Sequence, residues 1–292
     1  MAVQTSATGQ LENAAREMIA RARYTEEHNA PCMELIEKFT LEQGSDTLVI
    51  PKVGQMTMMG INEGQENTNE QDIGMTTISV QPSIVGAKVI ITDRLLRQNT
   101  QNIWTIVGKQ MGDAMARRKD TDIIALFSAL NGGTSLGAAG AAFSSANAVS
   151  CIGVARTGKY GTDLAFVMHP NSLLRLNRDL MVIGSGQIRP IPSGFSADRL
   201  SKFFDGIVLS GIPFFHDGNI TRDTSDDAIG ALFDKGALGI LQSVAMRKEK
   251  ERKPGIGDGA WALHVTADYG AFEIDDTKGA PCTYDAVNPA TS

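Results

Sequence analysis

The chain has 292 residues, enough for one large or two small domains, and it is 42% hydrophobic and 21% charged, as in an ordinary soluble globular protein. Its net charge of −6 argues against a dedicated nucleic-acid-binding domain, because such domains are usually strongly basic. The three cysteines are far apart and odd in number, which suggests neither a disulfide framework nor a zinc site. We expect reduced thiols in a cytoplasmic protein.

The chain begins with the polar segment "MAVQTSATGQ", which lacks the apolar core of a secretory signal. No stretch approaches the roughly 18 apolar residues that a membrane helix needs, so we expect no membrane contact. Residues 11–24 have apolar residues at helical spacing and predict a short amphipathic helix. We therefore expect a loose tail and a helix before the first core element.

Two β-branched segments, "TLVIPKV" and "TTISVQP", flank a polar stretch at residues 54–74. This pattern predicts a β-hairpin over residues 46–82. Hairpins usually close with about two to five residues, so a tip of this length is unusual. Ordering it costs about 1–2 kcal/mol per residue in backbone entropy, and it contains little apolar surface to offset that cost.

After a strand-like run, "GAKVIITDRLL", residues 101–130 predict a helix on the order of 45 Å long. The charged segment "ARRKDTD" interrupts its apolar stripe. Two interpretations remain open for that segment. It forms either a solvated face with internal ion pairs or a belt in which Arg117 and Arg118 pair with a neighbouring chain.

The segment "GGTSLGAAGAAFSSANAVS" is rich in small residues and is interpreted as a linker. From residue 151 to 241, helices alternate with strands, including a buried strand in "DLAFVMHP" and another in "GIVLSGIPFFHDGN". This alternation predicts a compact second domain.

The last fifth of the chain predicts two long strands, "SVAMRKEKERK" and "AWALHVTADYGAFEID". Side chains alternate along a strand, so Lys248, Lys250 and Arg252 share one face. A strand with charges on both faces is not a core strand. It is either a protected sheet edge or, as we favour, a seam between subunits; a phosphate-facing strip would bind only weakly.

The segment "GTSLG" matches the nucleophile-elbow pattern, which would make Ser135 the nucleophile of a serine hydrolase. That chemistry requires a strand before the serine and a helix after it, whereas this segment follows a predicted helix. The four histidines show no spacing typical of metal ligands. We therefore expect no catalytic residue, cofactor or metal, with the hydrolase kept as an alternative.

The order of these parts, with the segments "SIVGAKVIITDRLLRQ", "MGDAMARRKDTDIIALFSALNGG" and "DYGAFEIDDTKGAP", resembles the major capsid proteins of tailed bacteriophages. The resemblance covers about residues 25–285 and implies the α+β fold called Hong Kong 97-type. It implies these parts: an N-terminal arm at 1–45, an extended loop at 46–82, a peripheral domain at 83–149 with a spine helix at 101–130, an axial domain at 150–241, and peripheral return strands and a tail at 242–292.

The resemblance also implies a structural, non-enzymatic protein that assembles as hexamers and pentamers of an icosahedral shell enclosing double-stranded DNA. The implied location is the virion capsid, assembled in the cytoplasm of a bacterial host. Implied partners are many copies of itself, separate scaffold, portal and decoration proteins, and packaged DNA bound non-specifically. An encapsulin-like cellular compartment of the same fold and a nucleic-acid-binding module are the further alternatives.

In this family the extended loop lies across an adjacent subunit, which offers the polar tip a partner. Methionines in the tip suit such contacts, because their flexible side chains adapt to inequivalent surroundings. The residues inferred to contact other subunits are Lys52, Met56, Met58, Met59, Ile61, Arg117, Arg118, Lys248, Lys250 and Arg252.

Overall fold

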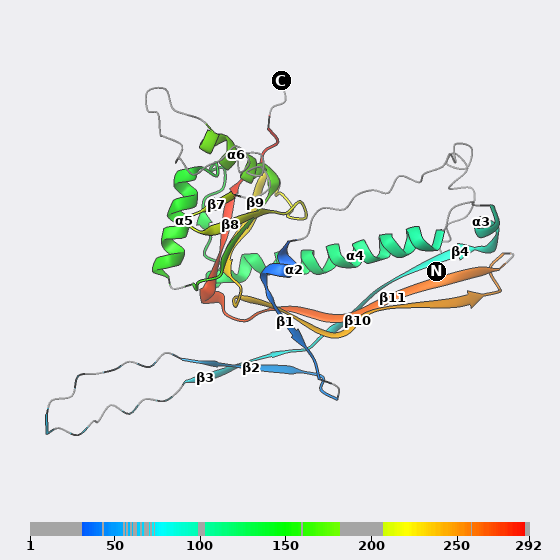
Figure 1. Ribbon diagram of the computed structural model, residues 1–292, viewed down its shortest axis with the longest axis horizontal. Helices are drawn as coiled ribbons and strands as arrows, with labels where there is room; N and C mark the ends of the chain where they lie inside the picture. The colour runs from blue at the N-terminus through cyan, green and yellow to red at the C-terminus, as the bar shows by residue number, and fades with distance from the viewer. Residues whose placement is uncertain are drawn as a thin grey trace.

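We analysed a computed structural model of the chain (Figure 1). The residues that it describes are 31–42, 44–54, 56, 58, 60, 63, 64, 66, 70, 72, 74–98, 103–158, 160–181, 207–257 and 259–289. The helix predicted at residues 11–24 lies outside these residues, as do Met59 and Ile61 of the hairpin tip.

The described residues form helices, short 3-10 segments and strands arranged in three sheets. The helical elements are α2 (Cys32–Leu35), α3 (Asp93–Gln98), α4 (Ile103–Leu126), η2 (Phe127–Gly133), α5 (Ser145–Thr157), α6 (Pro170–Met181) and η3 (Asp276–Lys278). The strands are β1 (Glu37–Thr40), β2 (Leu48–Val53), β3 (Met75–Val80), β4 (Ser83–Thr92), β5 (Leu136–Gly137), β6 (Leu164–Met168), β7 (Ile207–Leu209), β8 (Ile212–His216), β9 (Asp227–Asp234), β10 (Leu238–Lys253), β11 (Ala260–Glu273) and β12 (Gly279–Asp285).

A four-stranded sheet in the order β1-β10-β11-β4 lies along α4, and the helix and the sheet form one elongated layer pair (Figure 1). The 24 residues of α4 make a helix roughly 36 Å long. Its buried face carries Met111, Met115 and Ile123, which share one core with Leu263 and Val265 of β11. The predicted spine helix and the two long antiparallel strands are therefore present.

The spine helix is shorter than the predicted range of 101–130, because the regular helix ends at Leu126. A 3-10 segment follows, in which Leu130 has an extended backbone and Asn131 has a φ of 54°. Phe127 and Leu130 are both fully buried. The chain leaves the helix axis here because these two side chains enter the core between the two larger sheets.

The six-stranded sheet has the order β5-β12-β9-β6-β8-β7, with α5 and α6 beside it (Figure 1). Every residue of β6 is buried, as the run "DLAFVMHP" predicted. The single strand predicted in "GIVLSGIPFFHDGN" is in fact two strands, β7 and β8. They are joined by Ser210 and Gly211, both with positive φ, as in a tight two-residue hairpin turn.

Strand β12 lies inside the six-stranded sheet, paired with β9 and β5. The predicted range 242–292 had grouped it with the peripheral strands and the tail. The chain thus crosses from one sheet to the other twice between the start of β9 and the end of β12, first from β9 to β10 and then from β11 to β12. Sheet membership is decided by long-range pairing, which local sequence patterns do not encode.

The segment predicted as a linker is part of the core of this second unit. Phe143 is fully buried against Phe166, Phe214 and Tyr284, with ring centroids 4.7–6.2 Å apart. Helix α5 begins directly afterwards, with Ser144 accepting a hydrogen bond from the backbone N–H of Asn147. The small residues that suggested a linker instead allow close packing between α5 and the sheet.

We predict that Phe143→Ala lowers the free energy of unfolding by about 3–5 kcal/mol, because it leaves a cavity among three aromatic rings. The measurement is denaturant unfolding of the unassembled chain. The matched control is Val149→Ala in the same segment, whose side chain is 52% exposed and should change stability by less than about 0.5 kcal/mol. Equal and small effects of both substitutions would contradict the core assignment.

Candidate interaction surface

The β2–β3 hairpin projects away from both larger sheets and forms a two-stranded sheet of its own (Figure 1). Val53 and Met75 are cross-strand partners, and Val49 lies on the same face because side chains alternate along a strand. These three side chains are 56–61% exposed. Nothing in the described part of the chain covers this apolar face.

The described residues of the hairpin tip combine exposed methionines with acidic groups. Met56 is 54% exposed and Met58 is 97% exposed. The exposed acidic residues are Glu63, Glu66, Glu70 and Asp72. Between Lys52 and Lys88 the sequence contains no basic residue, so the tip carries an uncompensated charge of −4 from these four carboxylates.

Lys52 lies on the opposite face of the hairpin from Val53 and binds within its own chain. Its Nζ donates to Asp275 Oδ1 at 2.6 Å, just after the end of β11. The pKa of Asp275 is lowered in spite of partial burial, because Lys52 and Thr277 both donate to its carboxylate. Within its own chain Lys52 thus links the base of the hairpin to the end of β11, and its contact with a neighbouring subunit stays a prediction.

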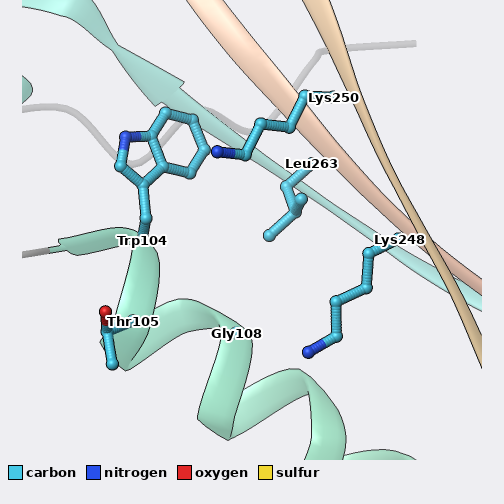
Figure 2. Close-up of a pocket in the computed structure, with 6 residues that line it drawn as sticks. All are labelled: Trp104, Thr105, Gly108, Lys248, Lys250 and Leu263. Carbon is cyan, nitrogen blue, oxygen red and sulfur yellow. The ribbon is translucent and has the colours of Figure 1, made fainter.

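A groove of about 340 Å³ lies between α4 and the C-terminal half of β10, which contains Lys248 and Lys250 (Figure 2). Its lining residues are Trp104, Thr105, Gly108, Lys248, Lys250 and Leu263. The Lys250 ammonium lies 4.3 Å from the centroid of the Trp104 ring, and both lysine side chains extend from β10 toward α4 (Figure 2). Among the described residues, neither Lys248 nor Lys250 forms an ion pair. The groove therefore presents two positive charges whose neighbouring groups are largely apolar.

The third basic residue on this face, Arg252, has a partner within the chain. Its guanidinium donates to both oxygens of Asp93, at 2.7 and 2.6 Å, and lies 5.1 Å from the Trp261 ring centroid. These hydrogen bonds hold the pKa of Asp93 below its usual value. Arg252 therefore differs from Lys248 and Lys250, with which the sequence grouped it.

The C-terminal half of β10 is a sheet edge, as one of the two sequence interpretations held. Strand β1 pairs only with residues 239–242 of β10, whereas β11 pairs with it as far as Lys253. Beyond Gln242, therefore, only one edge of β10 is paired with another strand of the described chain. Charged side chains on such an edge discourage uncontrolled strand pairing.

The charged segment of α4 contains an internal ion pair. Arg118 Nε lies 3.1 Å from Asp122 Oδ1, one helical turn away, and Tyr269 donates to the same carboxylate at 2.7 Å. This matches the interpretation of a solvated face with internal pairs. A contact of Arg117 and Arg118 with a neighbouring chain stays a prediction.

Ser135 does not have the surroundings of a catalytic nucleophile. Its Oγ lies 2.7 Å from Thr283 Oγ1 and accepts a hydrogen bond from the Thr283 backbone N–H at 3.1 Å. It follows η2 and precedes the short strand β5, which reverses the strand–turn–helix order that the chemistry needs. Its hydroxyl joins β5 to β12, and its hydrogen-bond partners among the described residues are backbone groups and the Thr283 hydroxyl, with no histidine or carboxylate.

The sequence patterns did not predict a buried polar cluster that the structure contains. Cys32, Asp120 and Asp217 are all fully buried, and they come from α2, α4 and the turn after β8. Cys32 Sγ donates to Asp217 Oδ2 at 3.4 Å, and Asn219 Nδ2 donates to Asp120 Oδ2 at 3.0 Å. The available signal was Asp120 itself, which stands three residues before the buried Ile123 and so falls on the apolar face of the helix.

None of the helices within the described ranges is long and apolar enough to cross a membrane. No protein-family model and no curated protein matches the sequence.

Solved structures match the chain over nearly its whole length. The capsid protein of cyanophage Pam1 matches with a TM-score of 0.72 and 11% identity, covering 99% of this chain and 100% of that one. The capsid of cyanophage P-SCSP1u gives 0.65 and 15%, covering 91% of each chain. The SrpI encapsulin of Synechococcus elongatus gives 0.63 and 13%, covering 100% of this chain and 99% of that one.

The chain has the Hong Kong 97-type capsid fold. At identities of 11–15% these matches establish the fold alone. That the β2–β3 hairpin is the extended loop of this fold and α4 its spine helix stays a prediction.

We predict that Lys52→Met loosens the base of the hairpin while keeping the length of the side chain. The pair is partly exposed, so it is worth at most about 1 kcal/mol, and amide hydrogen exchange in β2 and β3 should become about 2–5-fold faster. Lys88→Met, at an exposed position on β4, is the control and should leave exchange in the hairpin unchanged. Identical exchange in the two variants would show that the ion pair does not hold the hairpin.

Proposed function

We propose that the chain is the major capsid subunit of a tailed bacteriophage and that many copies of it form a closed shell around double-stranded DNA. The fold, shared with shell-forming proteins over at least 91% of the chain, supports this proposal. The observation that carries it is the β2–β3 hairpin, which extends from the body with an uncovered apolar face. A monomer would gain nothing from exposing this surface, whereas a neighbouring subunit would bury it.

Hexamers and pentamers are the arrangement that we propose for these copies. A closed shell requires one sequence to make slightly different contacts at several positions. Val49, Val53 and Met75 form a flat apolar strip, and the exposed Met56 and Met58 extend it with flexible side chains. Such a surface tolerates small changes of angle between subunits better than a set of directional hydrogen bonds would.

The acidic hairpin tip and the lysine groove are complementary in charge, and we infer that they meet between neighbouring copies. Within one chain the hairpin extends away from the α4–β10 groove (Figure 1), so the two surfaces favour an intermolecular contact. Glu63, Glu66, Glu70 and Asp72 supply carboxylates, and Lys248 and Lys250 supply ammonium groups without ion-pair partners among the described residues. Complementary charges of this kind speed association and fix the register of an interface.

We predict that the double variant Lys248→Glu/Lys250→Glu raises the concentration of free subunit in equilibrium with particles by at least about tenfold, since like charges would then face each other. Light scattering and sedimentation measure this concentration. Adding Glu66→Lys/Glu70→Lys should restore assembly, because the charges are then exchanged.

The control for this experiment is Lys38→Glu/Lys88→Glu, which makes the same charge change at exposed positions of the same sheet. If the control impairs assembly equally, or if the exchanged charges give no rescue, the proposed contact between tip and groove is wrong. Neither result would by itself refute shell formation.

The encapsulin match keeps a cellular compartment as the second candidate function. We predict that particles purified from the native source contain nuclease-protected double-stranded DNA and no stoichiometric protein cargo. Nucleic-acid extraction after nuclease treatment, together with mass spectrometry of the contents, separates the two candidates. Particles that hold a protein cargo and no protected DNA would reject the phage function and support the compartment.

A further inference from the structure

The buried cluster of Cys32, Asp120 and Asp217 lies at the meeting point of three structural units. One ligand atom from each residue lies within 4.8 Å of the other two, and all three residues are fully buried. Cys32 belongs to the helix that precedes β1, Asp120 to the spine helix, and Asp217 to the turn after β8 of the six-stranded sheet. The cluster is surrounded by apolar core residues, among them Ile36, Ile123 and Phe127.

The hydrogen bonds of the chain do not satisfy the whole cluster. Asp217 accepts from Cys32 Sγ and from the backbone N–H of Asn219, and Asp120 Oδ2 accepts from Asn219 Nδ2. Asp120 Oδ1 is buried and has no hydrogen-bond partner. A carboxylate oxygen left without a partner inside a protein is costly, and buried charges are normally paired or coordinate a metal.

No basic side chain in the described part of the chain pairs with the two carboxyl groups. None of the ion pairs formed there includes Asp120 or Asp217. Among the described residues, the side-chain oxygens of these two aspartates accept hydrogen bonds only from Cys32 and Asn219.

We propose that Cys32, Asp120 and Asp217 bind a divalent cation of the zinc type. The Cys32 thiolate and one oxygen from each carboxylate supply three ligands, and a fourth position remains for water or another donor. Binding releases the thiol proton to solvent. The thiolate favours zinc over magnesium or calcium, which prefer sites made of oxygen ligands only.

A cation at this position would join three elements that lie far apart in the sequence. Cys32 lies within the predicted N-terminal arm, residues 1–45, so the site would fasten that part of the arm to the spine helix and to the six-stranded sheet. Asp217 is held in turn by its backbone N–H, which donates to Met168 O of β6 at 3.0 Å. The proposed role is therefore structural, and it does not depend on the proposed shell function.

The test uses cobalt(II) as a spectroscopic probe for the zinc position. The purified, metal-free chain is titrated with cobalt(II), and absorption from sulfur-to-cobalt charge transfer is recorded together with the bound metal by mass spectrometry. We expect one cobalt per chain, a thiolate charge-transfer band, displacement by an equivalent of zinc, and an increase in the thermal unfolding midpoint with either metal. Magnesium and calcium should produce neither displacement nor stabilisation.

Four variants test the assignment of the ligands. Cys32→Ser should abolish the thiolate band, whereas Cys151→Ser, which alters another buried free cysteine outside the cluster, should retain it. Asn219→Ala should weaken zinc binding about 10–100-fold, because the Asn219 side-chain amide orients Asp120 without being a ligand, while the backbone N–H that donates to Asp217 is kept. Asp120→Asn keeps the shape of the side chain and should also lose binding.

Three results would overturn the proposal. They are substoichiometric binding of cobalt and zinc by the folded wild-type chain, a charge-transfer band that survives Cys32→Ser, and a band that disappears with Cys151→Ser instead. In the first case the two carboxyl groups would share a proton in place of a metal ion.

Discussion

The packing of α4 along the β10–β11–β4 sheet is the constraint on which the other features of this chain depend. The helix and the sheet share one buried core, to which the helix contributes Met111, Met115 and Ile123 and β11 contributes Leu263 and Val265. The lysine groove lies at the end of this layer pair where α4 begins. The opposite end, where α4 finishes, meets the six-stranded sheet and contains the Cys32, Asp120 and Asp217 cluster.

The same layer pair explains how an exposed hairpin is held. Strand β3 leads through Gln81 and Pro82 into β4, the edge strand of the four-stranded sheet, and Lys52 of β2 binds Asp275 beyond the end of β11. The base of the arm is therefore fixed at two points on a rigid support, while its apolar face is left uncovered. An arm with a fixed base and an open surface is suited to binding another subunit, because little orientational freedom is lost on contact.

Much of this architecture could be predicted from local patterns in the sequence. The β-branched runs on both sides of residues 54–74 indicated the hairpin, and the apolar stripe from Ile103 to Ile123 indicated the spine helix. These features depend on neighbouring residues alone. The order of these elements resembles that of the major capsid proteins of tailed bacteriophages, and this resemblance implied the fold.

The features that sequence reasoning missed depend on contacts between distant residues. Nothing local shows that β12 enters the six-stranded sheet, or that Phe143 closes an aromatic core from within an alanine- and glycine-rich segment. Strand alternation indicated that Lys248, Lys250 and Arg252 share one face of β10. Only the structure distinguishes Arg252, paired with Asp93, from the two lysines that line the groove.

The central claim is that this chain forms a shell through its hairpin, and the structure of the assembled particle at residue resolution tests it most directly. The account predicts closed shells in which the face of Val49, Val53 and Met75 is buried by a neighbouring copy. It also predicts that Glu66 or Glu70 of one copy lies within ion-pair distance of Lys248 or Lys250 of the next. Shells in which the face of Val49, Val53 and Met75 stays exposed, or in which the hairpins contact no other subunit, would contradict it.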